Sequence, residues 1–253
     1  FNVREVGFVD LGIEPYYLYG LLNQDTPADT VSSFKEISYT ALMDSNIKVE
    51  IIDTDQQKDH PAMKYLAPAQ AGAFPAAVLV SPDGQSLPMP IAKPDRPFKE
   101  TLGSALDSIA SSPKRQEILK LVCKTYGVVL LIEGTDQKEN TRAKQAASAA
   151  IEQVRSQMEW LPKPIAHAPV LVVVDQKSLS QEKILLWSLG LDAEKINEPH
   201  AAVLYGRARW IGPMFVGKQV TEDNLVSILF VIGADCECGF DHRWLQGTML
   251  PAK

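Results

Sequence analysis

The densest group of reactive side chains lies near the end of the chain, in GADCECGFDHRWLQG, residues 233 to 247. It holds two of the three cysteines, Cys236 and Cys238, and also His242. A Cys-x-Cys disulfide would close a small strained ring that is easily reduced, as a catalytic pair should be. Two thiolates and an imidazole are also ligands for zinc or copper. The spacing Cys-x-Cys-x3-His, however, matches no strong zinc signature. A third interpretation is a helix end followed by a tail, with idle or structurally bridged thiols.

Two further groups have residue types that suit ligand binding. The segment GRARWIG places Arg207, Arg209 and Trp210 in an expected hairpin, where alternation would put both arginines on one face. There they would hold a carboxylate or phosphate, or else stay solvated or pair with local acids. Asp53 and Asp55 follow an expected strand and would bind a divalent cation or cap the turn.

Composition narrows the class of protein. The chain has 253 residues, 45% of them hydrophobic, and a formal charge of −6. That length predicts one large or two small domains, and the negative charge disfavours nucleic acid as a partner. No apolar run is long enough to predict a membrane span, and no cofactor is predicted. The chain begins at Phe1 without a methionine, which we interpret as a removed leader or a trimmed end; a removed leader predicts a periplasmic or extracytoplasmic location.

The elements that must position these residues follow from hydrophobic periodicity and turn signals. Residues 3–10 alternate like a strand, and residues 14–22 indicate a strand or a short helix. A helix over 32–46, a strand over 47–55 and a short helix capped by Asp59 come next. Residues 74–91 predict a β-hairpin around Ser-Pro-Asp-Gly, whose second arm, with Pro88 and Pro90, should lie at a sheet edge or bulge there. A helix over 96–111 ends this half.

The second half starts the same order again. A helix precedes a buried strand over 127–134, and Cys123 is expected on the apolar side of that helix as a small buried residue. A long helix ends before Pro162, and the uniformly apolar segment 168–176 predicts a central strand covered on both faces. A helix, a second hairpin over 200–215 and a closing helix complete it.

The two halves form an internal repeat. Both hairpins begin with Ala-Ala-Val-Leu, at residues 76–79 and 201–204. The period is about 125 residues, which predicts two whole domains. The boundary should fall near 111–113, giving domain 1 over 1–112, with an irregular N-terminal segment, and domain 2 over 113–253, with a C-terminal tail.

Each half, with its order strand, helix, strand, helix, hairpin and helix, resembles the thioredoxin fold. Phe74-Pro75 stands where that family has a cis-proline. The resemblance implies an α/β protein of two thioredoxin-like domains, each a central mixed β-sheet flanked by helices. The family's Cys-x-x-Cys is missing from both strand–helix junctions, LLNQDTPADT and LIEGTDQKEN. When the repeats are aligned, His200 faces Pro75, and the neighbouring Pro199 is expected to be trans.

The sequence therefore favours a non-catalytic module that binds or scaffolds a protein or peptide. The alternatives are a thiol–disulfide oxidoreductase using Cys236 and Cys238, and a metal-binding protein using these thiols with His242. The expected binding groove consists of Phe74, Pro75, His200, Arg207, Arg209 and Trp210. Aromatic residues that would also furnish an interface, where they do not pack in the core, are Tyr16, Tyr17, Tyr19, Trp187, Trp210 and Trp244.

Overall fold

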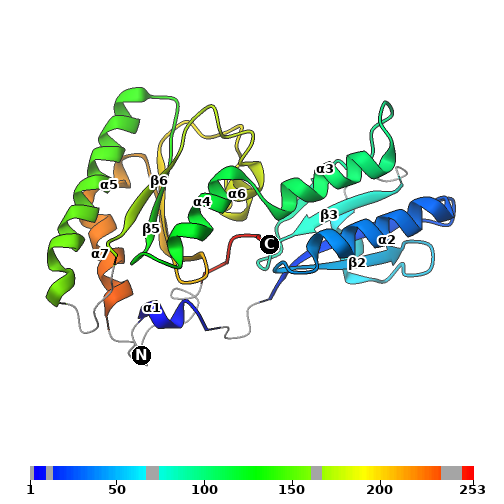
Figure 1. Cartoon of the computed structure of the whole chain (residues 1–253). Coiled ribbons are helices and arrows are strands. Elements are labelled where there is room, and N and C mark those ends of the chain that lie inside the picture. Colours follow the sequence, from blue (N-terminus) through cyan, green and yellow to red (C-terminus); the bar gives the residue numbers. More distant parts are fainter. Residues whose placement is uncertain (1–2, 10–13, 67–73, 161–166, 235–246) are drawn as a thin grey trace. The chain divides into compact units, whose positions relative to one another are not determined.

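The computed structural model describes residues 3–9, 14–66, 74–160, 167–234 and 247–253 (Figure 1). Its contacts divide the chain into two compact units. The first unit comprises Ile13–Ser111 and Pro251–Lys253, and the second comprises Phe1–Gly12 and Ser112–Leu250. The chain passes between units after Ser111, while residues 1–12 and 251–253 each join the unit that is distant from them in sequence. Whether each unit is an independent domain stays a prediction.

The first unit is a four-stranded sheet in the order β2-β1-β3-β4. Strands β1 (Tyr16–Leu22) and β2 (Ile47–Asp53) are parallel, whereas β3 (Ala76–Val80) and β4 (Ser86–Met89) form the antiparallel hairpin that the turn signal predicted. Pro88 lies in β4, and β4 is an edge strand, as its missing donor requires.

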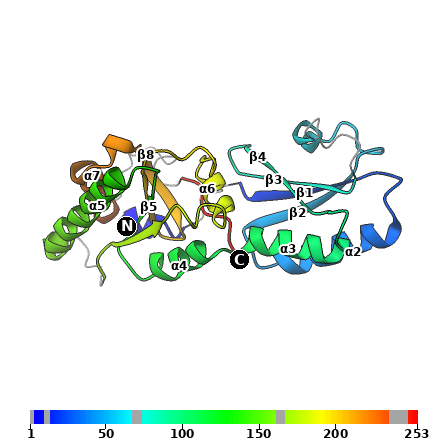
Figure 2. The same cartoon turned by 90° about the horizontal axis from the view of Figure 1, so that it is seen from above.

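Helices α2 (Ala28–Leu42) and α3 (Phe98–Ala110) pack together on one face of this sheet (Figure 2). Gly20 makes the close approach of α2 possible, because a side chain there would overlap the ring of Phe34. A 3₁₀ helix, η1 (Pro61–Tyr65), packs on the other face. Its cap is His60, whose side chain accepts a hydrogen bond from the Ala62 N–H, and not Asp59 as predicted.

The second unit repeats the arrangement, with the sheet order β6-β5-β7-β8. Its strands are β5 (Val128–Ile132), β6 (Val170–Val174), β7 (His200–Tyr205) and β8 (Arg209–Val216). The two Ala-Ala-Val-Leu segments lie in β3 and β7, at the same place in both sheets. The internal repeat is therefore present in three dimensions.

Helices cover both faces of this second sheet. One layer is α5 (Gln137–Gln157) with α7 (Glu222–Gly233), and the other is α4 (Pro113–Val122) with α6 (Lys183–Ser188) (Figure 1). The prediction that segment 168–176 is the central strand is wrong, because β6 lies at the edge and β5 is central. Helices on both faces make either strand apolar, so the composition of β6 did not reveal its position.

Two local expectations are also corrected. The predicted strand over 3–10 is instead the short helix α1 (Val3–Val6), whose Val3 is buried among the side chains of α5 and α7. Cys123 is exposed and not buried, because α4 ends at Val122 and Cys123 is the residue that caps it.

Candidate functional site

The Phe74-Pro75 peptide bond is cis, and no other described residue has a cis peptide bond. It immediately precedes β3, at the place that the family resemblance indicated. Phe74 is half-buried and packs against an apolar cluster on the sheet face opposite α2 and α3. Six side chains form that cluster: Leu21, Ile52, Ala62, Ala76, Val78 and Val80. The cis-proline loop thus borders one defined face of the first sheet.

Three tyrosines, which we call the tyrosine cluster, extend over this face: Tyr17, Tyr19 and Tyr65. Tyr17 and Tyr19 are two residues apart on β1, so their side chains point the same way. Their rings stack with centroids 5.4 Å apart and planes 2° apart. Tyr65, from η1, stacks on Tyr19 with centroids 6.2 Å apart. All three side chains are half-buried, so each ring has one part packed and another part open to solvent.

An acid and an imidazole adjoin the cluster. Glu50 on β2 lies beside Tyr19 in the strand register, and its Oε1 is 3.1 Å from Nε2 of His60. The His60 Nδ1 accepts from the Ala62 N–H at 3.2 Å, so in the neutral ring the proton is on Nε2 and is donated to Glu50. The His60 ring meets Tyr19 edge-on at 6.2 Å.

Electrostatics keeps Tyr19 neutral. Burial, and after it the neighbouring Glu50 carboxylate, raises the pKa of Tyr19 to about 12. Its phenol is therefore a hydrogen-bond donor near neutral pH and is unsuited to act as a base or nucleophile. The ammonium of Lys64 lies 4.8 Å from the centroid of the Tyr65 ring, in a cation–π contact. The cluster thus presents aromatic rings, a neutral phenol and a carboxylate on one face of the first sheet.

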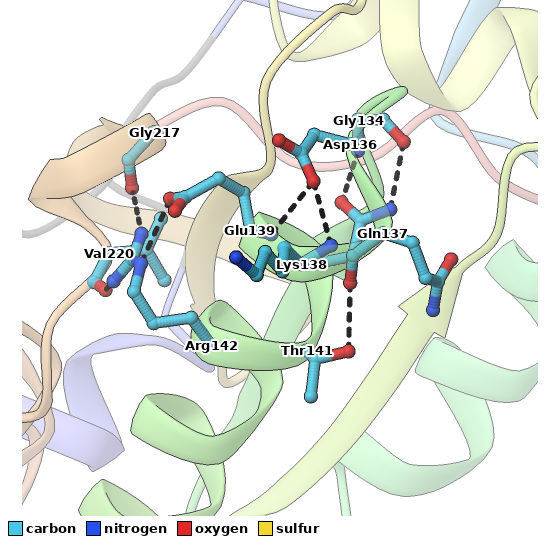
Figure 3. A network of polar contacts seen from close by, with 10 residues as sticks. Gly134, Asp136, Gln137, Lys138, Glu139, Thr141, Arg142, Gly217 and Val220 are labelled. Carbon is cyan, nitrogen blue, oxygen red and sulfur yellow. Dashed lines mark hydrogen bonds and ion pairs between the residues drawn. The ribbon is translucent and has the colours of Figure 1, made fainter.

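The strand–helix junction of the second unit, where the family has its dithiol, is occupied by protein hydrogen bonds (Figure 3). The buried Asn140 side chain accepts from the Gly134 N–H at 2.8 Å and donates to the Gly134 carbonyl at 2.9 Å. Asp136 caps α5 by accepting from the N–H groups of Lys138 and Glu139. The Thr135 N–H donates to the Asn197 carbonyl at 2.9 Å, which ties this loop to the one before β7.

Arg142 fixes the same junction from the next turn of α5. Its guanidinium donates to the carbonyls of Val220 and Gly217, both at 2.8 Å, and pairs with Glu139 at 2.9 Å (Figure 3). A charged side chain that makes three such contacts holds the helix end, the 3₁₀ turn after β8 and the loop between them in one arrangement. This junction is a structural lock.

The matching junction of the first unit is also closed locally. The Thr26 hydroxyl donates to Asn23 Oδ1 at 2.7 Å, and the Gln24 N–H donates to Asp55 Oδ2 at 2.9 Å. Asp53 accepts from the N–H groups of Asp55 and Gln56. Both aspartates therefore act as turn caps, which was one of the two interpretations of this pair.

The residues of the expected groove fall in both units. Phe74 and Pro75 belong to the first unit, and the other four belong to the second. The half-buried His200 has Nδ1 2.8 Å from the Glu198 carbonyl oxygen. Pro199, beside it, is trans, as expected. That all six residues form one groove stays a prediction.

The two arginines do not share a strand face as alternation predicted. Arg207 is exposed and lies in the turn before β8, where the two-residue period does not apply. Arg209 is the first residue of β8 and only 1% exposed, with Nη2 3.4 Å from the Val9 carbonyl. Trp210 is half-buried against the α4 and α6 side of the core. A solvent-facing clamp of both guanidiniums is therefore excluded.

Cys236, Cys238, His242 and Trp244 lie outside the described residues, so the redox and metal alternatives stay sequence-based predictions. Within the described ranges, no group of three or more histidine, cysteine or acidic residues is placed to hold a metal. No helix of those ranges is long and apolar enough to cross a membrane. Of the other aromatic candidates, Tyr16 and Trp187 are core residues, at 1% and 8% exposure.

No family model and no curated protein matches the chain. The solved structures that resemble it include the zinc-bound form of human ERp44, with 12% identity, a TM-score of 0.32, and 90% of this chain and 55% of that one covered. The first two thioredoxin domains of Saccharomyces cerevisiae Eps1p have 12% identity and a TM-score of 0.30, with 91% of this chain and 96% of that one covered. ERdj5 form II has 11% identity and a TM-score of 0.28, with 86% of this chain and 27% of that one covered.

The observed order of strand, helix, strand, helix, hairpin and helix is present in both units, with η1 as the second helix of the first. Both units therefore have the element order that the thioredoxin resemblance predicted. The chain spans little more than half of the ERp44 chain, and identities this low say nothing about activity. Sequence reasoning found Phe74-Pro75, Tyr17 and Tyr19 of the candidate surface, but missed Glu50, His60 and Tyr65. Tyr17, Tyr19 and Leu21 alternate along β1, and this spacing is the sequence signal that places them on the face of the candidate surface.

Proposed function

We propose that this tandem thioredoxin-like protein is a non-catalytic binding module, whose tyrosine cluster takes an extended peptide bearing a basic side chain. The supporting observation is the stack of three half-exposed tyrosines beside the cis-proline loop. Tyrosine offers a large contact area and a hydroxyl while losing few rotamers on binding, and it is enriched at recognition surfaces. Because the rings already pack on one another, little further ordering is needed when a ligand binds.

Charge supports a basic ligand. The first unit contains thirteen acidic and eight basic residues, so it carries −5 of the net charge of −6. Glu50 places a half-exposed carboxylate directly beside the Tyr19 ring. Lys64 already rests over Tyr65, which indicates that these rings accept a cation. A ligand arginine or lysine would meet both an aromatic face and an unlike charge.

Peptide selection followed by quantitative binding tests the proposal. The full chain is used to select from a random heptapeptide library, and selected peptides are labelled and titrated by fluorescence polarisation. We expect arginine or lysine in the selected sequences, and a dissociation constant raised about tenfold by Tyr17→Ala or Tyr65→Ala, since each removes a contact of hot-spot type. Trp160→Ala removes an aromatic side chain that is 85% exposed outside the cluster, and should change nothing.

Two results would overturn it. The first is that the folded chain selects no peptide from the library above background. The second is binding that both tyrosine variants retain at full strength, which would place the peptide elsewhere. Circular dichroism of each variant separates loss of the surface from loss of the fold.

A further inference from the structure

The outer edge of β2 is open in the described part of the chain, since no strand there pairs with it. The Tyr16 N–H donates to the Asn46 carbonyl, so that carbonyl faces β1. Peptide groups alternate in direction along a strand, and the backbone groups of Ile47, Val49 and Ile51 therefore face outward. The Ser45 hydroxyl accepts from the Ile47 N–H at 3.2 Å and donates to the Ile47 carbonyl at 3.3 Å. Val49 and Ile51 present the outward groups that remain for another strand.

An apolar hollow of about 440 Å³ adjoins this edge. It is lined by Tyr39, Thr40, Leu42, Met43, Ile47 and Val49. Met43 is 75% exposed and Tyr39 is 52% exposed, and these are two of the four large hydrophobic side chains exposed in the described chain. The predicted helix over 32–46 would include Met43, but α2 ends at Leu42 and Met43 lies just beyond it. Apolar exposure next to an open strand edge is typical of an interaction surface.

We propose that a second copy of this chain occupies the edge, with the two β2 strands antiparallel and Val49 opposite Val49 of the second copy. In this register Lys48 lies opposite Glu50 of the second copy, and Glu50 opposite its Lys48. Two unlike charge pairs form on the tyrosine-cluster face. The neighbouring register with the same facing, centred on Glu50, would set the two glutamates against each other. The charge pattern of the strand therefore selects both the register and the occupant.

The opposite face of the same strand gains apolar contacts. Ile47 meets Ile51 of the second copy there, and the two Val49 side chains meet at the symmetry axis. Tyr39 on α2 and Met43 just beyond its end line the hollow on this face, so the hollows of the two copies adjoin about the axis. An isologous contact of this kind closes after two copies. Glu50, whose Oε1 also contacts His60 at 3.1 Å, takes part in both this proposal and the proposed function. Lys48→Glu and Met43→Glu therefore test the dimer alone, whereas Tyr17→Ala and Tyr65→Ala test peptide binding alone.

Charge reversal with mixing tests the dimer. Sedimentation equilibrium of the full chain should give twice the monomer mass of 27.8 kDa. Lys48→Glu and Glu50→Lys should each raise the dissociation constant about tenfold or more, because each turns two attractive cross-strand pairs into repulsive ones. An equimolar mixture of the two variants should restore the dimer, because every cross-strand pair then joins a lysine to a glutamate. Lys99→Glu makes the same charge change on α3 and should have no effect.

Three outcomes would overturn the proposal: a wild-type chain that stays monomeric at its highest soluble concentration, a dimer that neither charge variant weakens, or variants that do not associate when mixed. The first would leave the edge to a strand of another protein, and the second would place the dimer on another surface. Met43→Glu, at an exposed position, gives a second variant that should weaken the dimer without disturbing the sheet.

Discussion

Replacing Asn140 by alanine should destabilise the second unit more than any exposed amide substitution. The Asn140 side chain is 2% exposed and satisfies both the N–H and the carbonyl of Gly134, at 2.8 and 2.9 Å. Asn140→Ala would leave both buried backbone groups without these partners. An unsatisfied buried group costs about 1–3 kcal/mol, so we expect a loss of about 2–4 kcal/mol in the free energy of unfolding.

Tryptophan fluorescence measures this loss in the correct unit. All four tryptophans lie between residues 160 and 244, within the second unit, and the first unit has none. Urea unfolding followed by this signal therefore reports on the second unit alone. With a slope of about 2 kcal/mol per molar urea, the midpoint should fall by roughly 1–2 M. The far-ultraviolet dichroism, which reports on both units, should keep a transition for the first unit at its original midpoint if the units unfold independently.

Two further variants separate the hydrogen bonds from side-chain bulk. Asn140→Asp keeps the shape and the acceptor, but replaces the donor by an anionic oxygen facing the Gly134 carbonyl. We expect it to be at least as harmful as alanine at neutral pH and to recover stability when acid protonates the carboxylate. Asn224→Ala removes a more exposed amide that donates to the Gln219 carbonyl at 2.8 Å, and should cost less than about 1 kcal/mol. An Asn140→Ala midpoint equal to that of Asn224→Ala would refute the assignment of this junction as a structural lock.

Three other outcomes follow from the described geometry. Burial raises the pKa of Tyr19 to about 12 in the folded state, whereas an unfolded tyrosine ionises near pH 10. The free energy of unfolding should therefore fall as the pH rises from 10 to 12. Tyr19→Phe should flatten that fall in denaturation curves measured across this range. Gly134→Ala places a Cβ 2.5 Å from Asn197 O and from Glu198 C, so about 1–3 kcal/mol should be lost in the fluorescence assay, and an unchanged midpoint would contradict the close approach. Gly103→Ala, with nothing within 4 Å in the middle of α3, should raise the stability of the first unit by about 0.5–1 kcal/mol in calorimetry, and a loss would show an unrecognised clash.

The repeat and both hairpins were predictable because they depend on local signals. Ser-Pro-Asp-Gly marks the turn of the first hairpin, and the paired Ala-Ala-Val-Leu segments mark the same strand in each half. The edge position of β6 could not be predicted from its apolar composition. A sheet covered by helices on both faces buries apolar side chains at its edge as well as at its centre. The helix Val3–Val6 was missed because residues 3–10 alternate as a strand would, and a helix of four residues is too short to show its own period.

The candidate surface was only partly predictable, for a related reason. Tyr17 and Tyr19 share a strand, and their spacing alone puts their rings on one face. Glu50, His60 and Tyr65 come from two other segments, and only the parallel β1–β2 register and the packing of η1 bring them there. Arg209 was misjudged because a charged side chain in a hairpin is usually solvated, whereas here the sheet and the Val9 segment enclose it.

The proposed function places recognition on a sheet face, and the two junctions support that proposal. Dithiol exchange in a thioredoxin-like unit needs an exposed sulfur pair at the strand–helix junction, and here backbone groups and short polar side chains occupy that place in both units. In the second unit Asn140 and Arg142 hold it closed, and helices cover both sides of the sheet. In the described part of the first unit, η1 lies on this face, and the three tyrosines near Phe74-Pro75 are half-buried. If Tyr17→Ala and Tyr65→Ala bind peptide as the wild type does, recognition does not reside on this face.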